Sequence, residues 1–183
     1  QGKALILFGA RQVGKTTMLK NMLRERDDVL WLNGDEQDVR SLFENASSTM
    51  LGAVIGKKKI VVIDEAQRIV NIGLCLKLII DNIPDVQVVA TGSSSFDLSN
   101  MINEPLTGRK IEYWMYPLSF GELVAHNGLL EEKRLLAHRL VYGSYPDVVN
   151  NVGDEKMVLS ELADIYLYKD ILMFDKIKKS DKL

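Results

Sequence analysis

The stretch GARQVGKT, from Gly9 to Thr16, decides the fold of this chain. It follows a wholly apolar run typical of a buried strand and precedes a run with apolar residues on one helical face. In that context G-x-x-x-x-G-K-[ST] predicts a phosphate-binding loop, because glycines let successive N–H groups converge on phosphate oxygens at a helix N-terminus. We expect Lys15 to reach the β- and γ-phosphates and the Thr16 hydroxyl to ligate Mg²⁺. The predicted nucleotide-binding residues are Gly9, Ala10, Arg11, Gln12, Val13, Gly14, Lys15, Thr16 and Thr17.

A second apolar run, Ile60 to Ile63, ends in the acidic pair Asp64-Glu65. An apolar strand that carries acidic residues at its carboxyl end is the Walker B pattern of nucleotide-binding proteins. We therefore expect Asp64 to hold Mg²⁺ and Glu65 to be the general base for the attacking water. Gln67 and Arg68 could line the same site, but an exposed first helical turn is an equally good interpretation.

A third apolar run, Gln87 to Ala90, ends in the polar sequence Thr91-Gly92-Ser93-Ser94-Ser95. A polar residue at the tip of this strand could contact the γ-phosphate or the attacking water, so Thr91 and Ser93 are candidate catalytic residues. The serines could equally cap the helix that follows. Both interpretations can hold for different residues of this segment.

The order of these motifs favours one branch of the phosphate-loop proteins. A full strand-helix unit lies between the phosphate loop and the Asp-Glu strand, which is typical of ATPases with an added strand and a catalytic glutamate. The sequence contains no Asn-Lys-x-Asp motif for reading guanine, so ATP is favoured over GTP. We expect a three-layer α/β domain with a mostly parallel sheet and a helical C-terminal extension.

Composition limits the partners and the compartment. The net charge of −2 gives no electrostatic reason to expect nucleic acid or an anionic membrane as partner. No apolar run approaches the ~20 residues that a membrane-spanning helix needs. The single cysteine, Cys75, lies in an apolar helical run and is typical of a core residue in a reducing compartment. We expect a cytoplasmic protein, and the abrupt start suggests a piece of a longer one.

Seven segments in order carry a resemblance to a known family: GARQVGKTTML, VIDEAQ, VVATGSSSFDLS, EPLTGRK, YPLSFGEL, GSYPDVV and YLYKDIL. Together they resemble the AAA-like ATPase domain of a large group of bacterial and archaeal proteins. The resemblance covers nearly the whole chain and implies an ATPase core over residues 1–126 and a lid-like helical extension over residues 127–183. The resemblance implies that members usually continue into a second half of uncharacterised, nuclease-like and winged-helix character, and we expect this sequence to stop before it.

The resemblance also draws attention to Arg109. AAA-like proteins often use an arginine, frequently from a neighbouring subunit, to stabilise charge on the transferring phosphoryl group. Arg109 is a candidate for this role, which would imply a homo-oligomer, but a turn arginine before the next strand is an equal alternative.

Taken together, these motifs predict ATP binding with Mg²⁺-dependent hydrolysis to ADP and phosphate. One alternative is a slow or non-hydrolysing switch or scaffold that controls an attached effector. A small-molecule phosphotransferase is disfavoured, because such enzymes have an arginine-rich lid and the segment after Gly143 contains no arginine.

Overall fold

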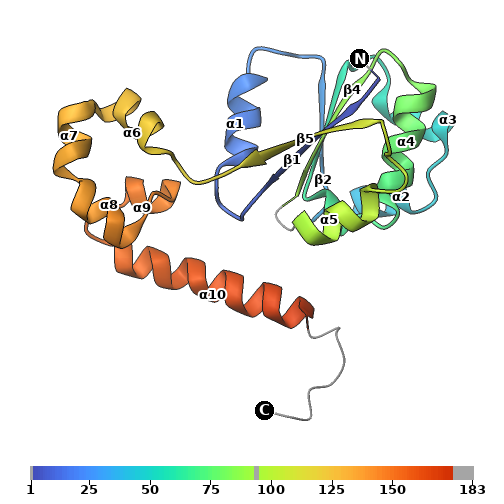
Figure 1. Cartoon of the computed structure of the whole chain (residues 1–183). Helices are drawn as coiled ribbons and strands as arrows, with labels where there is room; N and C mark the ends of the chain where they lie inside the picture. The colour runs from blue at the N-terminus through green and yellow to red at the C-terminus, as the bar shows by residue number, and fades with distance from the viewer. Residues whose placement is uncertain (1, 93–94, 175–183) are drawn as a thin grey trace, which may run out of the picture. The chain divides into compact units, whose positions relative to one another are not determined.

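The computed structural model describes residues 2–92 and 95–174 (Figure 1). The chain forms two compact units, which we call the sheet unit and the helical unit. The sheet unit comprises Gln1–Ala10 and Gly14–Met115, and the helical unit comprises Arg11–Val13 and Tyr116–Leu183.

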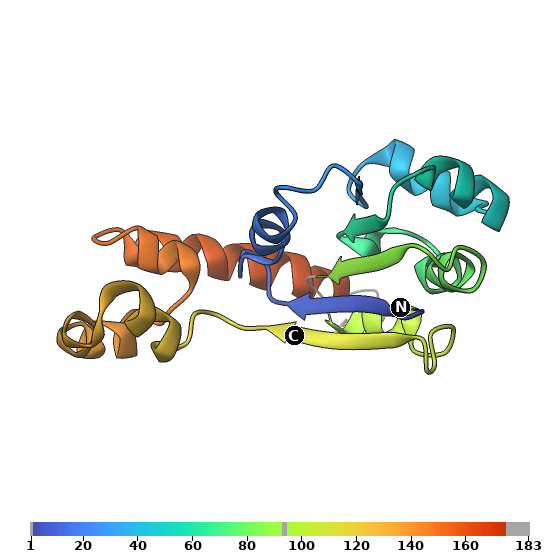
Figure 2. The same ribbon diagram turned by 90° about the horizontal axis from the view of Figure 1, so that it is seen from above.

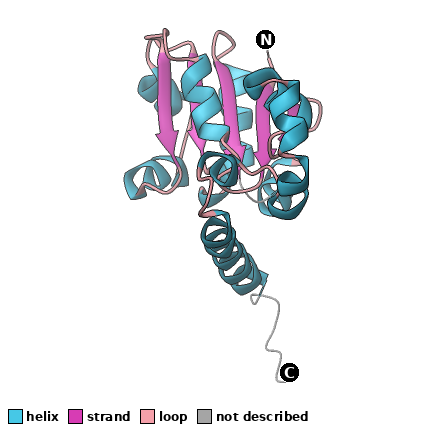
Figure 3. Cartoon of the chain, turned by 90° about the vertical axis from the view of Figure 1, so that its left-hand side faces the viewer, coloured by secondary structure: helices cyan, strands magenta, loops and turns pink. Residues whose placement is uncertain are grey.

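The strands of the sheet unit are all parallel. Among the described residues five strands form one sheet in the order β2-β3-β4-β1-β5, and Figure 3 shows their arrowheads at the same edge. The strands are β1 (Ala4–Gly9), β2 (Val29–Asn33), β3 (Ile60–Asp64), β4 (Gln87–Gly92) and β5 (Lys110–Met115). Their apolar runs suit a parallel sheet, because its strands are covered on both faces. The expected strand insertion is confirmed, since β4 separates β1 from β3.

Helices cover the two faces of the sheet unequally. Figure 1 shows α1 (Lys15–Met22) on one side of the sheet and the other helices of this unit on the opposite side. These are α2 (Gln37–Glu44), α3 (Ser48–Ile55), α4 (Ile72–Asn82) and α5 (Ser95–Ile102). Successive residues of β3 pack on opposite faces of the sheet. Val61 and Ile63 lie in the large core with residues of α2 to α5, whereas Val62 packs with Leu19 of α1. The three-layer α/β fold predicted from the sequence is therefore confirmed.

The segment after β3 differs from a simple helix start. The apolar spacing predicts a helix from about Arg68 to Asn82, but a 3₁₀ turn over Ala66–Arg68 comes first and α4 begins only at Ile72. The chain reaches α4 through Asn71, whose φ of 57° is left-handed. The α4 start also packs tightly, because a Cβ on Gly73 would lie 2.2 Å from the carbonyl oxygen of Met101 in α5. Periodicity alone does not report such tertiary constraints.

The helical unit contains five helices among the described residues. They are α6 (Phe120–Asn127), α7 (Leu129–Arg134), α8 (Leu136–Tyr142), α9 (Pro146–Asn150) and α10 (Glu155–Phe174). Ser119 and Glu122 form a capping box at the start of α6. Because Ser119 donates its backbone N–H and its hydroxyl to this carboxylate, the pKa of Glu122 is lowered.

A buried ion pair links helices of this unit. The fully buried Glu132 carboxylate accepts hydrogen bonds from Arg139 at 3.1 and 3.2 Å and from Asn127 at 2.7 Å. Arg139 first, and Asn127 second, lower the pKa of Glu132. A buried carboxylate without such partners would be strongly destabilising, so this network ties α6, α7 and α8 together.

The boundary between the two units lies after Met115, and α6 continues directly into α7 at Gly128. Helix α6 therefore belongs to the helical unit. The expected ATPase core over residues 1–126 stays a prediction.

None of the helices within the described residues is both long enough and apolar enough to cross a membrane.

Candidate nucleotide-binding site

The predicted phosphate loop connects β1 to α1, and its backbone has the required shape. Gly14 is the N-cap residue of α1 with a φ of 102°, a conformation that favours glycine. Gln12 also has a positive φ, of 56°. Gly14, as a glycine, has no side chain with which to cap α1, and the N–H groups of a first helical turn can bind an anion.

Lys15 lies folded against the loop. Its side chain is buried, and Nζ donates to the carbonyl oxygens of Gly9 at 2.7 Å and Ala10 at 2.8 Å. A buried ammonium group needs such partners, because removing a charge from water without them is costly. The loop carbonyls therefore hold the cation beside the loop backbone, where a phosphate would need it.

Asp64, the last residue of β3, accepts hydrogen bonds from two other elements at the carboxyl edge of the sheet. The Thr16 hydroxyl, from the start of α1, donates to Asp64 Oδ2 at 2.7 Å. The Thr91 hydroxyl, near the end of β4, donates to Asp64 Oδ1. Since β4 lies between β1 and β3, the fully buried Thr91 occupies the gap between the phosphate-loop strand and the acidic strand.

The Glu65 backbone is unusual and is held from several sides. Its φ of 49° and ψ of 42° are left-handed, which costs a non-glycine residue about 1–3 kcal/mol. Its N–H donates to Asp64 Oδ1 at 3.1 Å and Thr91 Oγ1 at 3.3 Å. The surrounding structure thus imposes this conformation at the place where we predicted the general base.

Gly34, directly after β2, is a further residue of the site that the sequence motifs do not identify. Its N–H donates to the Asp64 carbonyl at 2.8 Å, and a Cβ there would lie 2.4 Å from the Glu65 carbonyl oxygen. Any larger residue would displace the backbone of the acidic pair. The Asn33-Gly34-Asp35 sequence after β2 is the signal that could have identified this close approach.

The donor set fits a magnesium ion. A hydroxyl and a carboxylate meet at 2.7 Å beside a phosphate loop, and Mg²⁺ prefers oxygen ligands while keeping several waters and substrate phosphates. The described part of the chain has no group of three or more His, Cys, Asp or Glu residues that could enclose a metal by itself. Such an ion would therefore depend on phosphate and water for its remaining ligands.

Thr17 is an exposed residue of α1 next to Thr16. Arg11–Val13 are part of the loop between β1 and α1, although they are grouped with the helical unit, and their binding role stays a prediction. Ser93 lies outside the described residues.

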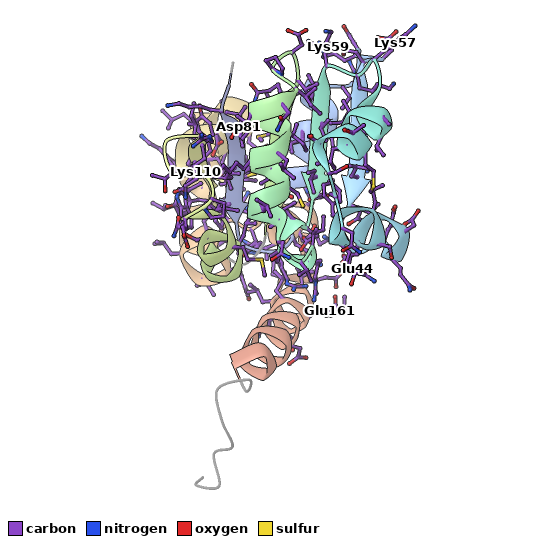
Figure 4. All side chains as sticks on the ribbon, turned by 90° about the vertical axis from the view of Figure 1, so that its right-hand side faces the viewer. Glu44, Lys57, Lys59, Asp81, Lys110 and Glu161 are labelled. Carbon is purple, nitrogen blue, oxygen red and sulfur yellow. The ribbon has the colours of Figure 1, made fainter. Side chains whose placement is uncertain are left out.

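Arg109 lies at the opposite edge of the sheet from the phosphate loop. It immediately precedes β5, and its carbonyl accepts from Ala4 N–H at the start of β1. The register pairs Ala4 with Lys110 and Gly9 with Met115, so six strand steps of about 3.3 Å separate Arg109 from the level of the loop. Figure 4 labels Asp81 and Lys110 at this edge, and Arg109 Nε contacts Asp81 Oδ1 at 2.8 Å. Arg109 therefore lies in the turn before β5, at the other end of the strands from the loop of the same chain, and its catalytic role stays a prediction.

Figure 2 shows the sheet unit from above, with α1 following the loop at the end of β1. The structure brings together Gly9, Ala10, Gly14, Lys15, Thr16, Asp64, Glu65 and Thr91 within this unit.

Comparison with known proteins gives a family and a fold. Residues 1–124 match the model of a family described as an AAA domain. A solved structure, the Walker-type ATPase of Pyrococcus abyssi, is similar with a TM-score of 0.56 and 17% identity, covering 96% of this chain and 71% of that one. This likeness concerns the fold, which is that of a Walker-type phosphate-loop ATPase.

Two curated relatives are longer than this chain. An uncharacterised protein of Methanocaldococcus jannaschii is 24% identical over 187 residues, which cover 93% of this chain and 42% of the relative. An uncharacterised protein of Haemophilus influenzae is 27% identical over 190 residues, which cover 91% of this chain and 45% of the relative. The chain spans less than half the length of these relatives. Because the family model matches more than half of the residues, the chain belongs to the AAA domain family.

Proposed function

We propose that this chain binds ATP together with Mg²⁺ and hydrolyses it to ADP and phosphate. One observation carries the proposal: the Thr16 hydroxyl and the Asp64 carboxylate meet at 2.7 Å, although 48 residues separate them in sequence. The AAA family supports nucleotide binding, and the adjacent Glu65 supports hydrolysis over binding alone.

Each residue has a defined task in this proposal. Lys15 and the first-turn N–H groups of α1 bind the phosphate oxygens. Thr16 and Asp64 hold the metal, which supplies neutralisation of the charge that develops on the phosphates. Thr91 orients Asp64 through its hydroxyl. The direct contact with the γ-phosphate or the attacking water that the sequence suggests for Thr91 stays a prediction.

Glu65 supplies the acid–base chemistry. It accepts a proton from a water molecule as that water attacks the γ-phosphorus, and the bond to the bridging oxygen of ADP breaks. The helical unit, in this proposal, corresponds to the lid-like extension of AAA-like proteins.

The direct test is phosphate release from ATP by the purified chain, with Mg²⁺ or with excess EDTA. We expect turnover with Mg²⁺ and none with EDTA, because Thr16 and Asp64 leave most metal ligands to phosphate and water. GTP is the matched control nucleotide and should be a poorer substrate. ATP binding without phosphate release would contradict hydrolysis and favour the alternative of a nucleotide-dependent switch or scaffold.

Arg109 stays a candidate for action on a neighbouring subunit, which would require a homo-oligomer. Its contact with Asp81 does not prevent this, since both side chains are more than a third exposed and such pairs are worth only about 0–1 kcal/mol. Mixing Arg109→Ala with Glu65→Gln protein should then restore part of the activity that each variant lacks alone. Full activity of Arg109→Ala by itself would exclude any catalytic role, and no recovery in assemblies confirmed by light scattering would exclude action between subunits.

A further inference from the structure

We infer that Gln67 is a positioning residue for Glu65: its side-chain amide holds the carboxylate in the orientation from which it accepts the proton of the attacking water. This inference rests on the hydrolysis proposed above and names a residue that acts through the base without touching the nucleotide.

The first observation is a short contact between the two side chains. Gln67 Nε2 donates to Glu65 Oε2 at 2.5 Å. A hydrogen bond to an ionised carboxylate is stronger than one between neutral groups, so it restricts the carboxylate effectively. The donor itself is well anchored, because Gln67 lies in the 3₁₀ turn that begins with the fully buried Ala66.

The second observation is the position of the other end of the same amide. A Cβ on Gly92 would lie 2.9 Å from Gln67 Oε1 and 2.7 Å from Leu98 Cδ2. Gly92 therefore leaves space for the Gln67 amide at the end of β4, one residue after Thr91. The amide lies between this strand end and the Glu65 carboxylate, so its donor faces the carboxylate.

Glu65 needs such a contact because its own side chain is long. A glutamate carboxylate is separated from its backbone by three rotatable bonds, and a general base must come within hydrogen-bond reach of the proton that it removes. The Glu65 N–H is already held by Asp64 and Thr91, and Gly34 lies close to the Glu65 carbonyl. Gln67 extends this restraint from the backbone to the reacting carboxylate.

The test is Gln67→Met, which keeps the length of the side chain and removes the donor. We expect kcat to fall about 10–100-fold, as when a group that orients a reacting residue is lost, while KM for ATP changes only a few-fold. Gln87→Met is the matched control: Gln87 starts β4 at the opposite edge of the sheet, where its amide donates to the carbonyls of Lys3 and Val88. This control should retain the wild-type kcat.

Two further variants separate positioning from packing. Gln67→Glu keeps the shape next to Gly92 but replaces the donor by a second carboxylate, so we expect kcat to fall at least as far as in Gln67→Met. In a Glu65→Gln background, Gln67→Met should lower the residual single-turnover rate no further, because Gln67 acts through Glu65.

The outcomes are distinct. Wild-type kcat in Gln67→Met, or a further loss of rate in the Glu65→Gln background, would overturn the role of Gln67. A fall in kcat accompanied by an equal loss of ATP affinity or of thermal stability, absent from Gln87→Met, would also overturn it in favour of a structural role. A wild-type rate no higher than that of Glu65→Gln would instead overturn the proposed hydrolysis mechanism, and the inference with it.

Discussion

Lys15→Ala is expected to abolish measurable ATP binding. Lys15 is the buried cation of the phosphate loop, and its Nζ already lies within 2.8 Å of two loop carbonyl oxygens. Removing it leaves the α1 N-terminus as the main attraction for the phosphates, and a helix dipole alone contributes only about 0.3–1 kcal/mol at an exposed site. Isothermal titration calorimetry with ATP and Mg²⁺ measures the effect.

The control for this variant is Lys20→Ala, in the last turn of the same helix, where the side chain is exposed. Its ATP affinity should equal that of the wild type. Because Lys15 also binds the Gly9 and Ala10 carbonyls, Lys15→Met serves as a second variant that keeps the aliphatic stem. Unchanged affinity in either folded Lys15 variant would disprove the assignment of the loop.

Glu65→Gln is expected to lose turnover while ATP affinity stays within a few-fold of the wild type. The amide keeps the shape of the side chain and can still accept the hydrogen bond from Gln67, but it cannot take a proton. Loss of a general base typically lowers the rate by about 10²–10⁴-fold. Single-turnover hydrolysis with enzyme in excess over ATP isolates this step from product release.

Glu44→Gln is the matched control, since Glu44 is an exposed residue at the end of α2 (Figure 4). It should retain the wild-type rate. If Glu65→Gln keeps wild-type turnover, the base lies elsewhere or the activity comes from a contaminant.

Much of the fold could be predicted because its signals are local. The apolar runs at Ala4 to Phe8, Ile60 to Ile63 and Gln87 to Ala90 each became a strand, with ends within two residues of the prediction. The apolar residues between Asp154 and Phe174 recur at helical spacing and predict a long helix there, and the structure has α10 over Glu155–Phe174. These features could be predicted because the pattern of apolar residues within a short stretch of sequence indicates a strand or a helix.

The candidate site was predictable to the extent that parallel strands end at one edge. The loop after β1 and the acidic pair after β3 had to share that edge once both strands were parallel members of one sheet. The sequence motifs predict a phosphate loop at the first position and a Walker B pair at the second. Because both lie at the same edge of the sheet, a contact such as that between Thr16 and Asp64 is expected.

Other features depended on contacts between distant segments. The sequence offers Thr91 as a candidate contact of the γ-phosphate or the attacking water. The insertion of β4 between β1 and β3 directs its hydroxyl to Asp64. The sequence left two interpretations of Arg109, a catalytic arginine and a turn arginine. The parallel register of β5 with β1 places it at the edge of the sheet away from the loop. Neither outcome could be obtained from spacing along the chain.

By itself, then, the sequence determined the strands, the phosphate loop and the acidic pair, because periodicity and motif chemistry act over a few neighbouring residues. Only the tertiary structure decided which polar group each site residue contacts, including Gln67 on Glu65 and Gly34 against the Glu65 carbonyl. The physical reason is that a hydrogen bond or a close approach depends on ångström-scale positions. Those positions are set by the order and register of strands that lie far apart in the chain.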